Sequence, residues 1–198
     1  GLTGIYDDVF LPLFGRHQSR NAVVALAATE AFIGGGALSL DIDAVREGFA
    51  AVTSPGRLEI VRRGPTVIID AAHNPAGAAS LADALGEAFA FTHLVGVVAV
   101  LADKDARGIL IALESVLDEI VVTQNDSPRR LPADDLAALA SEIFGEDRVT
   151  VSRRLEDALD AGVRLAEEAD TYAASGVIVT GSVVTAGEAR SLLARRDR

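Results

Sequence analysis

Residues that can bind a ligand or move a proton follow an apolar run near the middle of the chain. Residues 66–71 read as a buried strand, with Asp70 near its end and His73 just beyond it. Ligands of open α/β sheets bind at the carboxyl ends of strands. There a carboxylate can bond a ribose hydroxyl, and an imidazole before a helix start can face an anionic ligand or a substrate carboxylate. Each residue also has a structural interpretation, Asp70 as a cap for the next turn and His73 as a loop histidine.

Two cations accompany these residues. Arg57 lies in the Pro-Gly turn of residues 54–59, where its planar guanidinium can clamp phosphate oxygens or simply be solvated. Lys104 is the single lysine of the chain and lies between Asp103 and Asp105, after a predicted strand. Its ammonium can serve a ligand as a compact point charge, or it can belong to a solvated ion-pair cluster.

Helix-start signals account for several other polar residues. Asn74 stands immediately before Pro75 and is read first as a helix N-cap, with proline at the first helical position. His17 and Asn21 are four residues apart and so share one face at the start of a predicted helix. We interpret His17 as structural, whereas the amide of Asn21 can offer a donor and an acceptor to a base edge such as adenine.

Two later segments also follow predicted strands. Residues 123–130 carry Arg129 and Arg130, of which one can hold a substrate carboxylate while the other is interpreted as exposed. Residues 180–187 are small, so their backbone can approach a ligand or a neighbouring domain closely. Polar residues thus recur at the strand ends, which is stronger evidence for a site than any one of them alone.

The elements that position these residues alternate along the chain. Short apolar runs between amphipathic helices predict an α/β fold with a Rossmann-like, doubly wound, mostly parallel sheet and helices on both faces. A tight turn at residues 63–65 predicts that the first two strands pair antiparallel at one edge. The predicted helices are 17–33, 43–52, 75–90, 106–117, 133–144, 155–169 and 186–195, and the predicted strands are 58–62, 66–71, 93–101, 119–123, 148–152 and 177–180.

This pattern divides the chain near residue 53. Residues 1–53 hold two predicted helices and no sheet, so we interpret them as the tail of a neighbouring domain, and residues 54–198 as a complete Rossmann-like domain. The chain has no methionine and opens Gly-Leu-Thr-Gly, so we expect it to be a piece of a longer protein. No G-x-G-x-x-G follows the 66–71 strand and no G-x-x-x-x-G-K-[ST] occurs, which disfavours hydride transfer and autonomous P-loop hydrolysis.

Composition argues against several classes of function. The net charge of -11 disfavours binding to nucleic acid, and no apolar run is long enough to span a bilayer. The chain has no cysteine, and its three histidines show no metal-ligand spacing. The N-terminus lacks the features of a signal peptide, so we expect a cytoplasmic protein with no nucleic-acid or membrane partner.

Five motifs in order along the chain resemble a known family. They are Gly-Arg-His-Gln-Ser-Arg-Asn at 15–21, Pro-Gly-Arg-Leu-Glu at 55–59, Asp-Ala-Ala-His-Asn-Pro at 70–75, Ala-Asp-Lys-Asp at 102–105 and Gly-Ser-Val-Val-Thr-Ala-Gly-Glu-Ala-Arg at 181–190. The chain resembles the C-terminal part of folylpolyglutamate synthase/dihydrofolate synthase, within the Mur ligase superfamily. The second and third motifs at this spacing favour the folate ligases over most peptidoglycan ligases.

The resemblance implies an ATP-dependent, amide-forming reaction. ATP would phosphorylate a carboxylate of dihydropteroate or a tetrahydrofolate, and the amine of L-glutamate would attack the acyl phosphate. By matching position, Asn21 would contact the base of ATP, Asp70 the ribose and Arg57 the phosphates. His73 and Lys104 are assigned to substrate binding.

The family's P-loop, magnesium ligands and folate-binding loops belong to a larger N-terminal domain, and none of them is found in this sequence. We therefore expect the fragment to be inactive alone, with that N-terminal ATPase domain as its partner and Mg bound there. Two alternatives stay open. One is a Mur-type peptidoglycan amino-acid ligase domain, and the other is a non-catalytic nucleotide-binding or interaction domain.

Overall fold

The computed structural model describes residues 1–169 and 174–196, and the chain forms two compact units, Gly1–Pro55 and Gly56–Arg198. The first unit holds α1 (Arg16–Ile33) and α2 (Ile42–Ala50). Asp41 caps α2, because its side chain accepts a hydrogen bond from the backbone N–H of Ala44 at 2.9 Å. The two helices predicted for this part of the chain are thus present.

The first unit has little core of its own. Of residues 1–55 only Glu30 and Val45 are buried. An apolar cavity of about 320 Å³ lies between α1 and α2. Many large apolar side chains of the unit are exposed, namely Leu2, Ile5, Phe10, Phe14, Val23, Val24, Phe32, Ile33 and Leu38. Exposed apolar surface of this extent is typical of an interaction surface.

Glu30 ties the first residues of the chain to α1. Its carboxylate accepts hydrogen bonds from the hydroxyls of Thr3 and Tyr6, both at 2.7 Å, and from the backbone N–H of Leu2. The hydrogen bonds from the Thr3 and Tyr6 hydroxyls lower the pKa of Glu30 from its ordinary 4.5 to about 2, although burial acts in the opposite direction. The charged form of Glu30 is therefore the form that this segment stabilises.

We expect acid to release this segment between pH 4.5 and about 2. A carboxyl group whose pKa is lower in the folded state stabilises the fold fully above its unfolded pKa, and the contribution is lost as the pH falls through the folded pKa. NMR titration of the Thr3 and Tyr6 side chains measures the release. Glu30→Gln should abolish the titration step, and a wild-type midpoint close to 4.5 would contradict the assignment.

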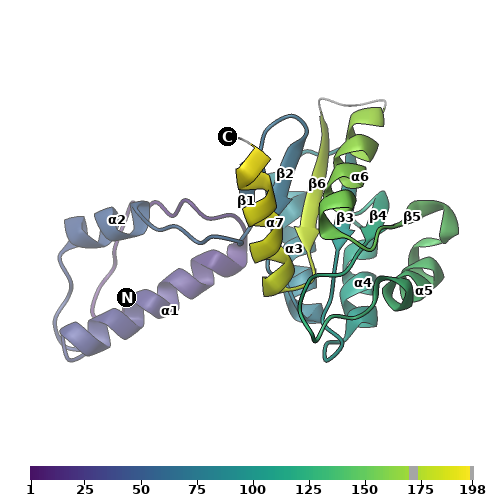
Figure 1. The fold of residues 1–198 in the computed structure, drawn as a ribbon. Helices are drawn as coiled ribbons and strands as arrows, with labels where there is room; N and C mark the ends of the chain where they lie inside the picture. Colours follow the sequence, from purple (N-terminus) through teal and green to yellow (C-terminus); the bar gives the residue numbers. More distant parts are fainter. Residues whose placement is uncertain (170–173, 197–198) are drawn as a thin grey trace. The chain divides into compact units, whose positions relative to one another are not determined.

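The second unit is a three-layer α/β/α domain built on a six-stranded sheet (Figure 1). The strands lie in the order β1-β2-β6-β3-β4-β5. Their bounds are β1 Glu59–Arg62, β2 Thr66–Ile69, β3 His93–Val98, β4 Glu119–Val122, β5 Val149–Val151 and β6 Ser175–Thr180. β1 pairs antiparallel with β2 at one edge, and the remaining pairs are parallel. This confirms the predicted fold class and the antiparallel edge.

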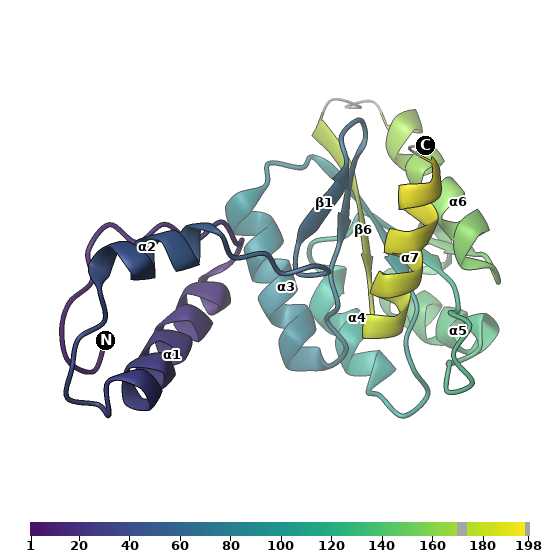
Figure 2. The same cartoon turned by 60° about the vertical axis from the view of Figure 1, so that its left-hand side comes forward.

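Helices cover both faces of this sheet (Figure 2). α3 (Pro75–Ala88), α4 (Ala106–Glu114) and α5 (Ala133–Phe144) pack on one face, while α6 (Leu155–Glu168) and α7 (Val183–Arg196) pack on the other. A short 3-10 turn, η1 (Glu146–Arg148), precedes β5. The central strands are buried on both sides, which explains their nearly continuous Val and Ile sequence.

Three predicted boundaries near the strand-end loops differ from the structure: β2 ends at Ile69 and β3 at Val98, before the predicted ends at residues 71 and 101, and the start of α7 also differs. α7 begins at Val183, three residues before the predicted start at Ala186. Ser182 causes the earlier start, because its hydroxyl accepts the backbone N–H of Thr185 at 2.9 Å and its carbonyl accepts the N–H of Ala186. Ser182 is thus a helix N-cap that the sequence analysis did not identify.

Candidate functional site

Asp70, which follows the carboxyl end of β2, connects the turn before β1 to the loop after β2 through hydrogen bonds. It is only 5% exposed, and its two carboxylate oxygens accept hydrogen bonds from the backbone N–H groups of Leu58 at 3.0 Å and Ala72 at 2.8 Å. Leu58 has a positive φ of 47° and is itself buried. Asp70 therefore caps the turn that follows its strand and also holds the turn that carries Arg57.

Glu59 secures the other side of the Arg57 turn. One of its oxygens accepts the backbone N–H of Gly56 at 2.8 Å, and the other accepts a hydrogen bond from Nε of Arg190, also at 2.8 Å. The carbonyl of Gly56 in turn accepts the N–H of Ala71. Arg57 is left exposed on a turn that is fixed from both sides. An exposed guanidinium on a fixed backbone is suited to clamp an anionic ligand.

His73 follows in the loop between β2 and α3. The ring is half-buried, and its Nδ1 lies 3.0 Å from the carbonyl oxygen of Ala71. A carbonyl oxygen only accepts hydrogen bonds, so Nδ1 carries the proton and donates it. In the neutral ring the lone pair then lies on Nε2, which fits a residue that accepts a proton or a hydrogen bond from a ligand.

Asn74 is the N-cap of α3, as predicted from the Asn-Pro pair. Its side-chain oxygen accepts the backbone N–H of Gly77 at 2.8 Å. We expect Asn74→Ala to lower the free energy of unfolding by about 1 kcal/mol, and Asn74→Asp to have almost no effect, because aspartate caps equally well. Urea unfolding of both variants measures the difference, and equal stabilities for the two would contradict this account.

The N-termini of α3 and α4 meet at this edge of the sheet. A Cβ atom on Gly108, in the first turn of α4, would lie 2.6 Å from Cγ of Pro75, the first residue of α3. Only glycine therefore permits this close packing. Each helix carries a partial positive charge at its N-terminus, so two such ends side by side favour an anion.

Lys104 lies immediately before α4 and is half-buried. Its Nζ is 3.1 Å from Oδ2 of Asp103, whereas Asp105 caps α4 by accepting the N–H of Gly108 at 2.8 Å. Nη1 of Arg129 approaches the same Asp103 oxygen at 3.8 Å. The hydrogen bond from Lys104 and the charge of Arg129 lower the pKa of Asp103. Lys104 and one of the two candidate arginines thus belong to one ion-pair cluster, and Arg130 instead donates to the carbonyl of Ser127.

A buried polar network, not predicted from the sequence, joins the loops after β3, β4 and β6. Asn125 is 1% exposed, and its Nδ2 lies 3.2 Å from the hydroxyl oxygen of Ser182 and 3.0 Å from that of Thr185. The Thr185 hydroxyl donates to the carbonyl of Ala99 at 3.0 Å. The available signals were a Ser-x-x-Thr cap pattern and an asparagine two residues after Thr123, and neither identifies its distant partner.

Among the small residues at 180–187, Gly181 makes a close approach within its own unit. Gly181 has φ 107°, and a Cβ atom there would lie 2.5 Å from the carbonyl oxygen of Ala99. Its own N–H donates to the carbonyl of Ala72. The close approach that glycine permits is therefore made to the loop after β3 of the same unit, and it draws the β2, β3 and β6 ends into one rim.

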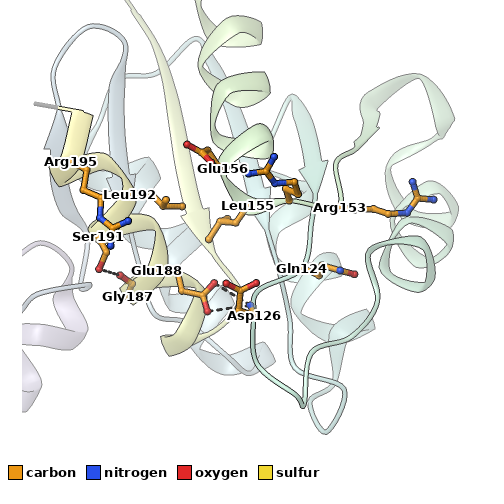
Figure 3. Close-up of a pocket in the computed structure, with 11 residues that line it drawn as sticks. Gln124, Asp126, Arg153, Leu155, Glu156, Gly187, Glu188, Ser191, Leu192 and Arg195 are labelled. Carbon is orange, nitrogen blue, oxygen red and sulfur yellow. Dashed lines mark hydrogen bonds and ion pairs between the residues drawn. The ribbon is translucent and has the colours of Figure 1, made fainter.

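A cavity of about 440 Å³ lies between the loops after β4 and β5, the start of α6 and one side of α7 from Gly187 to Arg195 (Figure 3). Glu188 on its wall accepts the N–H of Asp126, and Arg154 pairs with Glu156 at 3.2 Å. Burial raises the pKa of Glu188, although the hydrogen bond from the Asp126 N–H acts in the opposite direction. Its acidic and basic side chains are equal in number, so this cavity shows no preference for either sign of ligand.

The remaining candidates lie in the first unit. His17 and Asn21 are both on α1, where His17 is half-buried and Asn21 is exposed. Within residues 1–169 and 174–196, no group of three or more His, Cys, Asp or Glu side chains is placed to hold a metal ion. The same described residues contain no helix long and apolar enough to cross a membrane.

Together these features define a class: a doubly wound α/β domain whose strand-end loops carry His73, Lys104 and two helix N-termini. Residues 56–182 match the family described as Mur ligase, glutamate ligase domain. The chain belongs to the Mur ligase family, and the resemblance noted from its motifs is confirmed.

Individual relatives agree with this assignment. The chain is 56% identical to the dihydrofolate synthase/folylpolyglutamate synthase of Mycobacterium tuberculosis, over 98% of its own length and 42% of the relative's. The crystal structure of folylpolyglutamate synthase from M. tuberculosis complexed with ADP and AMPPCP matches with a TM-score of 0.94 at 57% identity, over 98% of this chain and 43% of that one. Escherichia coli FolC in complex with DHPP and ADP matches with a TM-score of 0.80 at 30% identity, over 97% and 42%. The chain thus spans less than half the length of these relatives.

Proposed function

We propose that this chain is the C-terminal part of an ATP-dependent ligase that adds L-glutamate to dihydropteroate or a tetrahydrofolate. The observation that carries the proposal is the fixed rim bearing His73 and Lys104, in a chain 56% identical to a dihydrofolate synthase/folylpolyglutamate synthase. In the proposed reaction a substrate carboxylate takes the γ-phosphoryl group of ATP, and ADP is released. The amine of glutamate then attacks the acyl carbon, the amide forms, and inorganic phosphate and a proton leave.

The positive groups at the strand ends are suited to bind the negatively charged species of this reaction. Acyl phosphate and glutamate both bring negative charge, and the attacking amine must lose a proton. The Lys104 ammonium and the N-termini of α3 and α4 offer positive charge, and Nε2 of His73 offers a lone pair. Positive groups held in place before the reaction stabilise such charge without rearranging. We therefore assign His73 and Lys104 to the substrate side of the site.

The nucleotide is assigned to Asn21, Arg57 and Asp70 by the family resemblance. The exposed guanidinium of Arg57 on its fixed turn supports a role with phosphate oxygens. Asp70 accepts backbone N–H groups through both oxygens, which supports a role in holding that turn and adds a structural function to the proposed ribose contact. The exposed amide of Asn21 is free of the core and suits a base edge.

We propose that residues 1–53 belong to a central ATP-binding domain that other residues of a longer parent protein complete. The exposed apolar side chains of α1 and of the preceding segment support this, since they need a covering surface. The P-loop and the magnesium ligands are then supplied by that domain, which is the intramolecular partner of the Rossmann-like domain. ADP and AMPPCP in the M. tuberculosis structure support nucleotide use.

We expect the 198-residue chain alone to release no phosphate from ATP in the presence of dihydropteroate, L-glutamate and magnesium. The reason is that two closing domains must contribute to the site. A coupled phosphate assay on the chain and on the full-length parent makes the comparison, with the parent as the positive control. Turnover by the chain alone would contradict the proposed division of the site, and a parent that uses a peptidoglycan precursor but no pteroate would overturn the folate assignment.

A further inference from the structure

The protons of the buried Asn125 network can be arranged in one way only. The amide oxygen of Asn125 accepts the backbone N–H of Ser127 at 3.1 Å, so the NH2 group faces the hydroxyls of Ser182 and Thr185. The carbonyl of Ala99 only accepts, so the Thr185 hydroxyl must donate to it. The Ser182 hydroxyl, 2.7 Å from that of Thr185, must then donate to Thr185.

This arrangement of the hydroxyl protons requires that the NH2 group of Asn125, and not an acceptor, face the two hydroxyls. Both hydroxyl oxygens accept a hydrogen bond from the amide, so their own protons point onward, from Ser182 to Thr185 and from Thr185 to the carbonyl of Ala99. A side chain at position 125 that accepts instead of donating would draw those hydroxyl protons toward itself. The carbonyl of Ala99 would then lose its donor inside the protein, which is costly for a buried polar group.

The network also holds the loop that carries Lys104. The turn that Asn125 begins reaches Arg129, whose carbonyl accepts the backbone N–H of Ala102 at 2.8 Å. Arg129 and Lys104 approach the same oxygen of Asp103. The loop after β3 is thus held at its start by the Thr185 hydroxyl and in its middle by the turn from Asn125.

We propose that Asn125 is a positioning residue for Lys104, an inference that rests on the proposed ligase function. Its buried amide fixes the hydroxyl protons of Ser182 and Thr185 and the turn to Arg129, and through them the loop that presents Lys104 to L-glutamate. Asn125 is too deeply buried to touch a substrate itself.

Asn125→Asp in the full-length parent tests the polarity directly, since it keeps the shape and replaces the two N–H donors by an acceptor. We expect the KM for L-glutamate to rise about tenfold or more, and the KM for ATP to change by less than about twofold. A general loss of folded protein would lower the activity without separating the two KM values.

A second pair of variants keeps the test valid should Asn125→Asp fold poorly. Thr185→Val removes the hydroxyl but keeps the branched shape, and it should raise the glutamate KM in the same way. Thr185→Ser keeps the hydroxyl, so its KM for L-glutamate should be close to that of the wild type. Gln124→Ala is the matched control in the same loop, because the Gln124 side chain accepts the N–H of Ala133, the first residue of α5, and lies outside the network.

Amide exchange on the 198-residue chain gives a readout that does not depend on activity. Asn125→Asp and Thr185→Val should speed exchange at Ala102 and Ser127, and Gln124→Ala should not. Unchanged exchange together with an unchanged glutamate KM, or equal rises in both KM values, would overturn the inference. A wild-type parent that forms no amide from glutamate would instead show that the proposed function is wrong, and the inference would fall with it.

Discussion

Replacing Asp70 by asparagine is expected to lower the free energy of unfolding of the second unit by about 2 to 4 kcal/mol. The two oxygens of the buried carboxylate accept the N–H groups of Leu58 and Ala72. An asparagine of the same shape keeps one acceptor and turns an NH2 group toward the other N–H. One buried backbone donor then loses its partner and faces a second donor.

Urea unfolding of wild type and variant measures this loss. Asp105→Asn is the matched control, since Asp105 makes the same chemical kind of bond, to the N–H of Gly108, at an exposed helix start where asparagine caps equally well. The control should change the stability by less than about 0.5 kcal/mol. Equal effects at the two positions would show that the burial of Asp70 contributes nothing.

The sheet and its helices could be predicted because their signals are local. Runs such as Val67 to Ile69 are apolar on both faces, as buried parallel strands require, and the Asn74–Pro75 pair marks the start of α3. The antiparallel pairing of β1 and β2 was also predictable, because the tight turn at residues 63–65 is a local signal. Each of these patterns lies within a few residues, so no distant contact is needed to interpret it.

The candidate site was predictable only as a set of positions. Asp70, His73 and Lys104 could be placed at strand ends, but the sequence contains no sign that Leu58 takes a positive φ and turns its N–H toward Asp70. An apolar residue rarely adopts that conformation. The Asn125 network could not be predicted either, because the hydrogen-bond partners of Asn125 lie 57 and 60 residues further along the chain.

Arg57→Ala in the full-length parent is expected to reduce kcat/KM by about 30- to 1,000-fold, which is about 2 to 4 kcal/mol of transition-state stabilisation. The guanidinium would stabilise the negative charge on the transferring phosphoryl group in the transition state. Arg57 is exposed and its turn is held by Asp70 and Glu59, so the loss should appear in the kinetics with little change in stability. Steady-state kinetics together with urea unfolding separate these effects, and wild-type kinetics would remove Arg57 from the site. Arg63→Ala, an exposed arginine at the opposite end of β1, is the control.

Combining Arg57→Ala with Asp70→Asn distinguishes two roles for Asp70. If Asp70 acts through the turn that it holds, the double variant should lose little more kcat/KM than Arg57→Ala alone, because the side chain that the turn positions is already gone. If Asp70 bonds the ribose directly, the two losses in free energy should add. The geometry favours the first outcome, since both carboxylate oxygens already accept backbone N–H groups and a ribose hydroxyl would have to share an oxygen with one of them. Additive losses would therefore require the Asp70 carboxylate to serve the nucleotide and the turn at the same time.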